Sequence, residues 1–195
     1  MIIRIVMLLS AALLLSGCMV GQQLSVNYVP AASQLPANGV VVTVAVSDKR
    51  DFVLKGEKDA AYVGSYTAGL GNRWSVMNLD NVPLAAQIAK DLKQELVSLG
   101  YAEATAGQKE LRVTIQEWVF AGYQNAEFEY ALLVEVLDKG GKKLFETTLK
   151  GRKDVPGTIM SGMKGGMERD MPGIYNAIIR SIARDNTAVL AALKS

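Results

Sequence analysis

LRVTIQEWVFAGYQNAEFEYALLVEVLDKGGKKLFETTLK, residues 111–150, is the stretch that decides the fold class of this chain. Apolar and polar residues alternate through most of it, which is typical of strands with one buried face. Glu117 interrupts the apolar face of the first predicted strand near its end. The first strand is predicted to bury Leu111, Val113, Ile115 and Val119, and the second Phe128, Tyr130, Leu132, Val134 and Val136.

Residues 138–141, Asp-Lys-Gly-Gly, form a predicted turn into a third strand at Leu144 to Lys150. So short a loop can only join antiparallel strands. Upstream, residues 39–47 predict a strand that is largely apolar on both faces, so we expect it to lie centrally in the sheet. The irregular region that follows, residues 48–80, also allows short strands at Tyr62–Tyr66 and Trp74–Leu79.

Helices are predicted on either side of the three strands. The first, Pro83 to Leu99, has an apolar stripe and a glycine stop at Gly100. The second, Ile174 to Ala183, breaks near Asp185 before a short last turn. Strands grouped between helices predict an α+β fold. We therefore expect residues 39–195 to form a single domain, a mostly antiparallel sheet of about four to five strands with two helices packed on one face.

The N-terminus carries an export signal. Arg4 precedes an apolar run, residues 5–15, which is too short to span a membrane as a helix. Leu-Ser-Gly-Cys at residues 15–18 then resembles the lipobox of bacterial lipoproteins at every position. That resemblance implies cleavage after Gly17 and acylation of Cys18, including palmitate. Two or more acyl chains anchor a protein stably to a bilayer.

The residues after Cys18 predict how the anchor is used. Met19 stands where an Asp favours inner-membrane retention in enterobacterial lipoproteins, so the resemblance implies the periplasmic face of the outer membrane. Residues 18–38 contain Gly21, Pro30 and Pro36, which predict a lipidated N-terminus and tether. Alternation of Leu24, Val26 and Tyr28 with polar residues also allows a short edge strand there.

Composition excludes several function classes. The 195 residues include 21 Lys or Arg, 19 Asp or Glu, one Cys and no His, giving a net charge of +2. A net charge so close to zero does not indicate the basic surface patch that is typical of nucleic-acid-binding proteins. Without His, the chain has no Ser-His-Asp triad and no His metal ligand. Neither glycine-rich nucleotide fingerprint is present. We expect no enzymatic activity, no cofactor and no metal.

Two motifs in the Gly- and Met-rich segment, residues 157–172, resemble patterns that carry chemistry in other proteins. Ser161 and Lys164 match the Ser-x-x-Lys pattern of penicillin-binding enzymes, but their companion motifs are missing and the chain is small for that fold. Thioethers also suit Cu(I). Methionines at helical spacing are more typical of a core or an adaptable partner surface. The sequence therefore allows core, lid and binding surface as alternatives for this segment, whose methionines are Met160, Met163, Met167 and Met171.

Two further groups are candidate functional positions. Asp48 and Arg50 follow the strand at residues 39–47, and we expect an ion pair or backbone hydrogen bonds to the loop ending near Gly64. This structural or binding loop would fix how the chain leaves the strand. Trp118 and Phe120 alternate with the core set of their strand, so they mark either an exposed apolar patch or the underside of a helix.

The whole mature chain resembles the YajG-type family of small proteobacterial lipoproteins. The features that match are the strand at Val40–Val46 running into Ser-Asp-Lys-Arg at residues 47–50, the Leu-Gly-Tyr at 99–101, the hairpin Tyr130–Leu149 and the closing helix Ile174–Asp185. The resemblance implies an envelope location and carries no established activity.

The sequence therefore predicts a membrane-anchored, non-enzymatic envelope module. One hypothesis is a scaffold that holds an envelope protein complex or the cell wall. The alternatives are a carrier or receptor for a small apolar or lipid ligand held between helices and sheet, or an auxiliary lipoprotein of a transport system.

Overall fold

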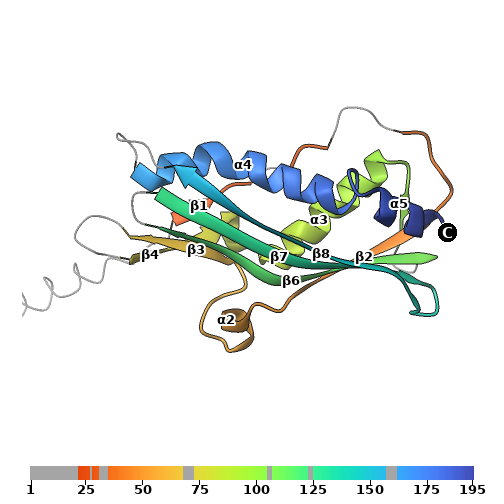
Figure 1. Ribbon diagram of the computed structural model, residues 1–195, viewed down its shortest axis with the longest axis horizontal. Helices are drawn as coiled ribbons and strands as arrows, with labels where there is room; N and C mark the ends of the chain where they lie inside the picture. The colour runs from red at the N-terminus through yellow and green to blue at the C-terminus, as the bar shows by residue number, and fades with distance from the viewer. Residues whose placement is uncertain are drawn as a thin grey trace, which may run out of the picture.

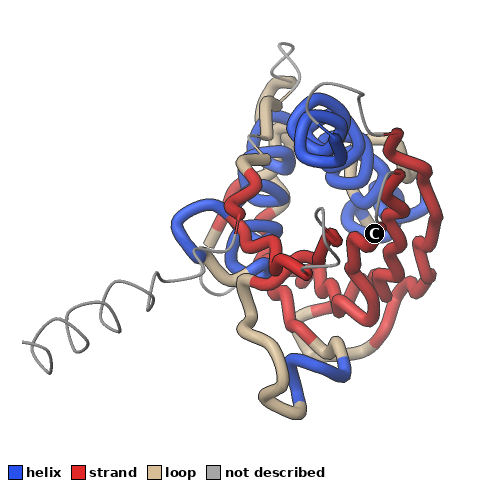
Figure 2. The backbone as a smooth tube through the Cα atoms, turned by 90° about the vertical axis from the view of Figure 1, so that its left-hand side faces the viewer, coloured by secondary structure: helices blue, strands red, loops and turns tan. Residues whose placement is uncertain are grey.

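The computed structural model describes residues 22–26, 28–30, 35–67, 73–104, 107–122, 125–156 and 162–195. Its strands form one eight-stranded mixed sheet that curls around the helices (Figures 1 and 2). In chain order the elements are β1 (Gln22–Leu24), β2 (Val41–Asp48), α2 (Asp51–Leu54), β3 (Tyr62–Thr67), β4 (Arg73–Asn78), η2 (Leu79–Asn81), α3 (Leu84–Ser98), β5 (Ala102–Glu103), β6 (Lys109–Gly122), β7 (Asn125–Asp138), β8 (Lys143–Pro156), α4 (Gly162–Ile182) and α5 (Thr187–Lys194).

Strand β6 is the centre of the sheet. One edge pairs along its whole length with β7, which pairs in turn with β8. The other edge is shared, because β2 pairs with its first half and β3 with its last residues. Strand β4 continues the sheet from β3 to β1, and the short β5 lies beside β2.

The prediction of a mostly antiparallel sheet of four to five strands was wrong. The pairs β1–β4, β2–β5, β2–β6 and β3–β6 are parallel, so the eight-stranded sheet is mixed. Alternation reveals that a segment is a strand but does not reveal its partner. The parallel partners are far apart in the chain, because β3, β4, α3 and β5 lie between β2 and β6, and β2 and β3 lie between β1 and β4. Long connections of this kind allow parallel pairing, which a short loop does not. The antiparallel return of β8 along β7 is as expected.

A β-bulge at Gln116 changes which side chains of β6 are buried. The pairing of β6 with β7 shifts register between Ile115 and Glu117. One extra residue reverses the alternation beyond it. Trp118 and Phe120 therefore join Ile115 in the core, while Glu117 is exposed and Val119 is only half-buried.

Three helices, α3, α4 and α5, lie on the concave face of the sheet (Figures 1 and 2). Helix α3 buries the predicted stripe of Leu84, Ile88, Leu92 and Leu96. Helix α4 begins well before the predicted residue 174 and contains Pro172. Its first turns bury Met167 and Met171, so packing of this face maintains the helix where the glycines and proline predict an irregular segment.

Part of the segment expected to be a tether belongs to the folded body. Strand β1 pairs with β4, and the side chains of Leu24, Val26 and Tyr28 are buried in the core. Further along, Leu35 donates its backbone N–H to the carbonyl of Ser98 over 2.9 Å. The described residues between 22 and 38 thus lie against the sheet and helices.

Arg50 fills the fork where β2 and β3 separate along β6. Its side chain is fully buried, and its Nη2 lies 2.6 Å from the Asp48 carboxylate. Its Nη1 donates to the carbonyls of Tyr62, over 2.5 Å, and Trp118, over 3.3 Å. Nη2 also donates to the Ala60 carbonyl over 3.1 Å. One guanidinium therefore donates to a carbonyl of β6 and to carbonyls at and just before the start of β3. The expected ion pair with Asp48 is also present.

Gly64 lets β3 approach β6 closely just beyond this fork. A Cβ at Gly64 would lie 2.3 Å from the carbonyl oxygen of Phe120. Any larger residue would push the two strands apart at the point where their pairing begins, Gly64 opposite Phe120.

Arg50→Met tests the fork. The change leaves Asp48 without its partner and removes the donors for three carbonyls, and breaking a buried pair costs about 3–5 kcal/mol. We expect denaturant unfolding to show a loss of that size. Lys49→Met is the matched control, because Lys49 is exposed and only its backbone N–H bonds Ile115. If Arg50→Met proved as stable as Lys49→Met, the account would be contradicted.

Candidate ligand-binding groove

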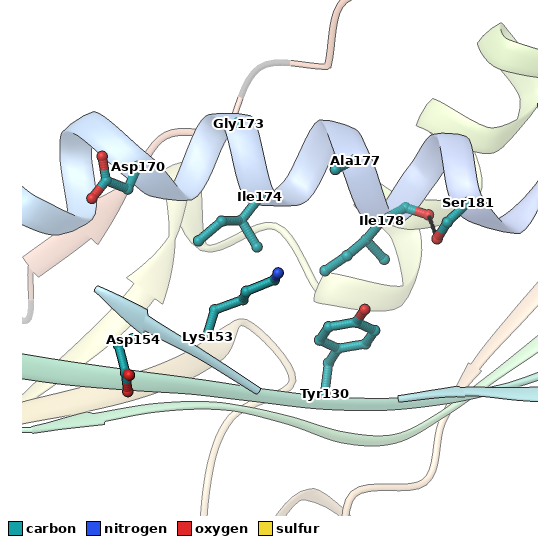
Figure 3. Close-up of a pocket in the computed structure, with 9 residues that line it drawn as sticks. All are labelled: Tyr130, Lys153, Asp154, Asp170, Gly173, Ile174, Ala177, Ile178 and Ser181. Atoms are coloured by element: carbon teal, nitrogen blue, oxygen red, sulfur yellow. Dashed lines mark hydrogen bonds between the residues drawn. The ribbon is translucent and has the colours of Figure 1, made fainter. Parts of the chain in front are cut away.

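A groove of about 570 Å³ runs between α4 and the end of β8. Figure 3 shows the side chains of α4 on one side and those of β7 and β8 on the other. Its volume lies within the range of about 300–1,000 Å³ that is usual for small-molecule sites. The lining residues are Tyr130, Lys153, Asp154, Asp170, Gly173, Ile174, Ala177, Ile178 and Ser181.

The wall and floor of the groove are apolar. Ile174 and Ile178 are one helical turn apart on α4, so both reach the same side. Tyr130 of β7 lies across from them (Figure 3). Behind Tyr130, the ring of Phe128 stacks at a centroid distance of 5.7 Å and that of Trp118 lies at 6.4 Å. The floor is therefore backed by a packed aromatic cluster.

Gly151 of β8 makes room for the Tyr130 ring. The two residues are directly opposite each other in the β7–β8 register. A Cβ at Gly151 would lie 2.7 Å from Cε1 of Tyr130. The absence of a side chain at this position allows the ring to lean across β8 toward the groove.

The polar groups of the groove are unevenly paired. Asp170 is bound by Arg169, whose Nε lies 2.6 Å away, and Ser181 donates to the Ile178 carbonyl over 2.7 Å. In contrast, no carboxylate within the described ranges forms an ion pair with Lys153. Its ammonium points between Ile174 and Ile178 (Figure 3). The groove thus combines an apolar wall with an exposed lysine that forms no ion pair among the described residues.

Buried hydrogen bonds hold α4 against α3 above the sheet. The Tyr175 hydroxyl donates to the Asp91 carboxylate over 2.6 Å, and Gln87 donates to the same oxygen over 2.7 Å. One turn further along α3, the fully buried Glu95 accepts from both Tyr28 and Arg184. Tyr175 also contacts Trp118 at a ring distance of 5.9 Å. This network fixes the helical wall of the groove relative to its floor.

The same network shifts two tyrosine pKa values. Burial raises the pKa of Tyr175 far above its usual value, and the nearby charge of Asp91 adds to the effect. Burial and the hydrogen bond to Glu95 raise the pKa of Tyr28 in the same direction. Both phenols therefore keep their protons in the folded protein, where they serve as hydrogen-bond donors to buried carboxylates.

The candidate residues singled out in the sequence are distributed over different parts of the molecule. Trp118 and Met167 are 2% and 3% exposed, so both lie in the core and form no exposed partner surface. Trp118 lies beneath a helix, because its ring packs on that of Tyr175 in α4. Asp48, Arg50 and Gly64 organise the strand fork. Gly17, Cys18, Met160 and Ser161 lie outside the described residues, as do the side chains of Met163 and Lys164.

Sequence reasoning missed Lys153 as a functional candidate and treated Tyr130 and Ile174 as core. Their alternation and helical spacing indicate burial, and no signal in the pattern separates a core wall from the wall of a groove. Glu127 and Glu129 of β7 both pair with Arg152 of β8.

Comparison with solved structures supports the fold. A Xanthomonas campestris protein of the family described as DUF330 matches with a TM-score of 0.57 and 10% identity, covering 87% of this chain and 99% of that one. A hypothetical protein from Chlamydia trachomatis reaches 0.48 at 10% identity, covering 77% and 95%. The Neisseria meningitidis lipoprotein GNA1162 reaches 0.29 at 14% identity, covering 73% and 99%. At such identities the first likeness concerns the fold alone, and the other two scores are too low to establish it.

No family model and no curated relative matches the chain. Within the part of the chain that the structure describes, every helix is too short or too polar to cross a bilayer.

Alkaline pH should lower the stability of the folded protein by removing the contribution of Tyr28 and Tyr175. Tyrosines in an unfolded chain ionise near pH 10, whereas Tyr28 and Tyr175 resist ionisation when folded. Their contribution to stability is therefore complete below about pH 10 and is lost as the pH rises further. Melting temperatures measured from pH 8 to 11 should fall less steeply in the double variant Tyr28→Phe, Tyr175→Phe than in the wild type. Parallel curves would show that these phenols do not carry the effect.

Proposed function

We propose that this chain is a lipid-anchored, non-enzymatic binding protein of the bacterial envelope, and that its groove between α4 and β8 binds an amphipathic ligand with an anionic headgroup. The observation that carries the proposal is the Lys153 ammonium, which points between Ile174 and Ile178 and forms no ion pair among the described residues. Hydrogen bonds to charged groups contribute about 1.5–3 kcal/mol. An anionic group would gain that interaction while its acyl or ring portion covers the apolar wall.

The anchor part of the proposal rests on residues 15–18. Leu-Ser-Gly-Cys follows an apolar run of signal-peptide length, and Cys18 is the only cysteine of the chain. Lipidation there explains why an exported protein would carry a lone cysteine. We further propose the outer membrane, from Met19, and membership of the YajG-type family, from the resemblance in element order and local motifs.

The groove supports binding more readily than catalysis. With no His in the chain, its titratable side chains are Lys153, Asp154, Asp170 and Tyr130. Asp170 is engaged by Arg169. The walls instead provide what ligand recognition needs, apolar area together with a small number of placed polar groups.

A second candidate is a scaffold that binds a protein partner by strand addition. Among the described strands β8 pairs only with β7, so its other edge is available to an extended peptide. The charged side chains along β8, among them Lys150 and Arg152, disfavour this mode, because charge on an edge strand discourages pairing. An auxiliary role in a transport complex would use this edge.

Native mass spectrometry of the full-length protein extracted from membranes tests the ligand. We expect an adduct of an anionic amphiphile on the wild type and its loss in Lys153→Glu, because the ammonium is replaced by a repelling carboxylate. Lys150→Glu is the matched control, since it makes the same charge change on the same strand outside the groove. Spectra without adduct, or equal adducts on both variants, would overturn the ligand proposal and favour strand addition.

Metabolic labelling with palmitate tests the anchor. Wild-type protein should incorporate the label and Cys18→Ser should not, because the substitution removes the thiol that accepts diacylglycerol. Cys18 precedes the first described strand, so the melting temperature of the variant should equal that of the wild type. An unlabelled wild-type protein, processed at an ordinary secretory site, would refute lipid anchoring.

A further inference from the structure

The short connection between Cys18 and the folded body limits where the body can lie. Cys18 is four residues before Gln22, the first residue of β1. A fully extended chain spans at most about 3.3–3.6 Å per residue, so this connection reaches no further than about 14 Å. Given the lipid anchor proposed above, on which this inference rests, the start of β1 is held close to the bilayer.

The pairing of β1 determines which end of the molecule is close. Gln22 pairs with Val76 in parallel register, so following β1 toward the anchor leads toward Arg73, the first residue of β4. The burial of Leu24 and Val26 holds this strand in the core. Trp74 is two residues before Val76, a distance of about 7 Å along a strand.

We propose that this end of the sheet rests on the bilayer, with Trp74 and Tyr66 at the membrane interface. The two aromatic residues are directly opposite each other on β4 and β3, and both are half-buried. Trp and Tyr are the residues that gather at membrane–water interfaces. Beside them Arg73 is exposed, and its Nε donates to the Ser65 hydroxyl over 2.9 Å. No described carboxylate forms an ion pair with Arg73, which leaves its charge for lipid phosphates.

The same orientation brings the groove to the membrane. Pairing across the sheet runs in one row through Trp74, Tyr66, Gly122, Ala126 and Val155. Asp154, which lines the groove, is the neighbour of Val155. Figure 1 shows α4 beginning at this end of the molecule as well. The groove therefore begins at the bilayer-facing end, and membrane lipid is the source of ligand that the orientation favours.

Tryptophan fluorescence gives a direct test, because the chain has two tryptophans and the second, Trp118, is 2% exposed. Full-length lipidated protein is reconstituted into vesicles whose phospholipids carry brominated acyl chains, with unbrominated vesicles as reference. We expect bromination to reduce wild-type emission and to leave the emission of Trp74→Phe unchanged. Trp118 serves as an internal control in the core, and the conservative change at a half-buried site preserves the fold, which circular dichroism verifies.

Vesicle flotation separates this proposal from the anchor. Protein that floats with vesicles but shows no quenching of Trp74 would overturn the orientation and leave the anchor intact. Equal quenching in the wild type and Trp74→Phe would overturn it too, since the quenched residue would then be Trp118. Protein that fails to float would refute the anchor and, with it, the orientation.

Discussion

The buried guanidinium of Arg50 is the interaction on which the arrangement of the sheet depends. Strand β6 pairs with two strands along one edge, and where they separate the backbone carbonyls of β6 and of the loop before β3 need donors. Arg50 bonds Trp118 on one side of the fork and Tyr62 and Ala60 on the other, while Asp48 neutralises its charge. A lysine ammonium lacks the planar, branched set of donors with which the guanidinium makes these contacts. Arg50 therefore joins the part of the sheet formed by β1, β4 and β3 to the part formed by β2, β6, β7 and β8.

The connection that Arg50 makes matters for function because the two parts of the sheet carry different features. The β1–β4–β3 part holds the N-terminal segment and the aromatic pair, and the β6–β7–β8 part forms the floor of the groove. The polar contacts of Asp91 and Glu95 then fix α4, the other wall, to α3 and to Tyr28 of the N-terminal segment. An anchor attached to β1 would in this way be rigidly connected to both walls of the binding site.

Local sequence patterns predict the elements better than their assembly. The alternation in β7 and the leucine and isoleucine spacing in α3 each require one buried face, and both faces are buried as expected. The bulge at Gln116 reverses the alternation in β6. Glu117 marks an interruption of the apolar face in the sequence, but a single charged residue does not identify the interruption as a bulge. Parallel pairing was missed because its partners, such as β2 and β6 or β1 and β4, are far apart in the chain, and a local pattern does not reveal a distant partner. The groove was missed because Ile174 and Tyr130 have the spacing of core residues, and the isolation of Lys153 is visible only once β8 and α4 are placed together.

Native-state hydrogen exchange tests most directly whether Arg50 makes the sheet one unit. The account predicts that the protected amides of β3 and β4 open with the same free energy as those of β6 and β7, because both parts unfold together. In Arg50→Met the β3 and β4 amides should then exchange at a lower opening free energy than β6 and β7. The account would be contradicted if β3 and β4 already opened separately in the wild type, with an opening free energy that Arg50→Met leaves unchanged.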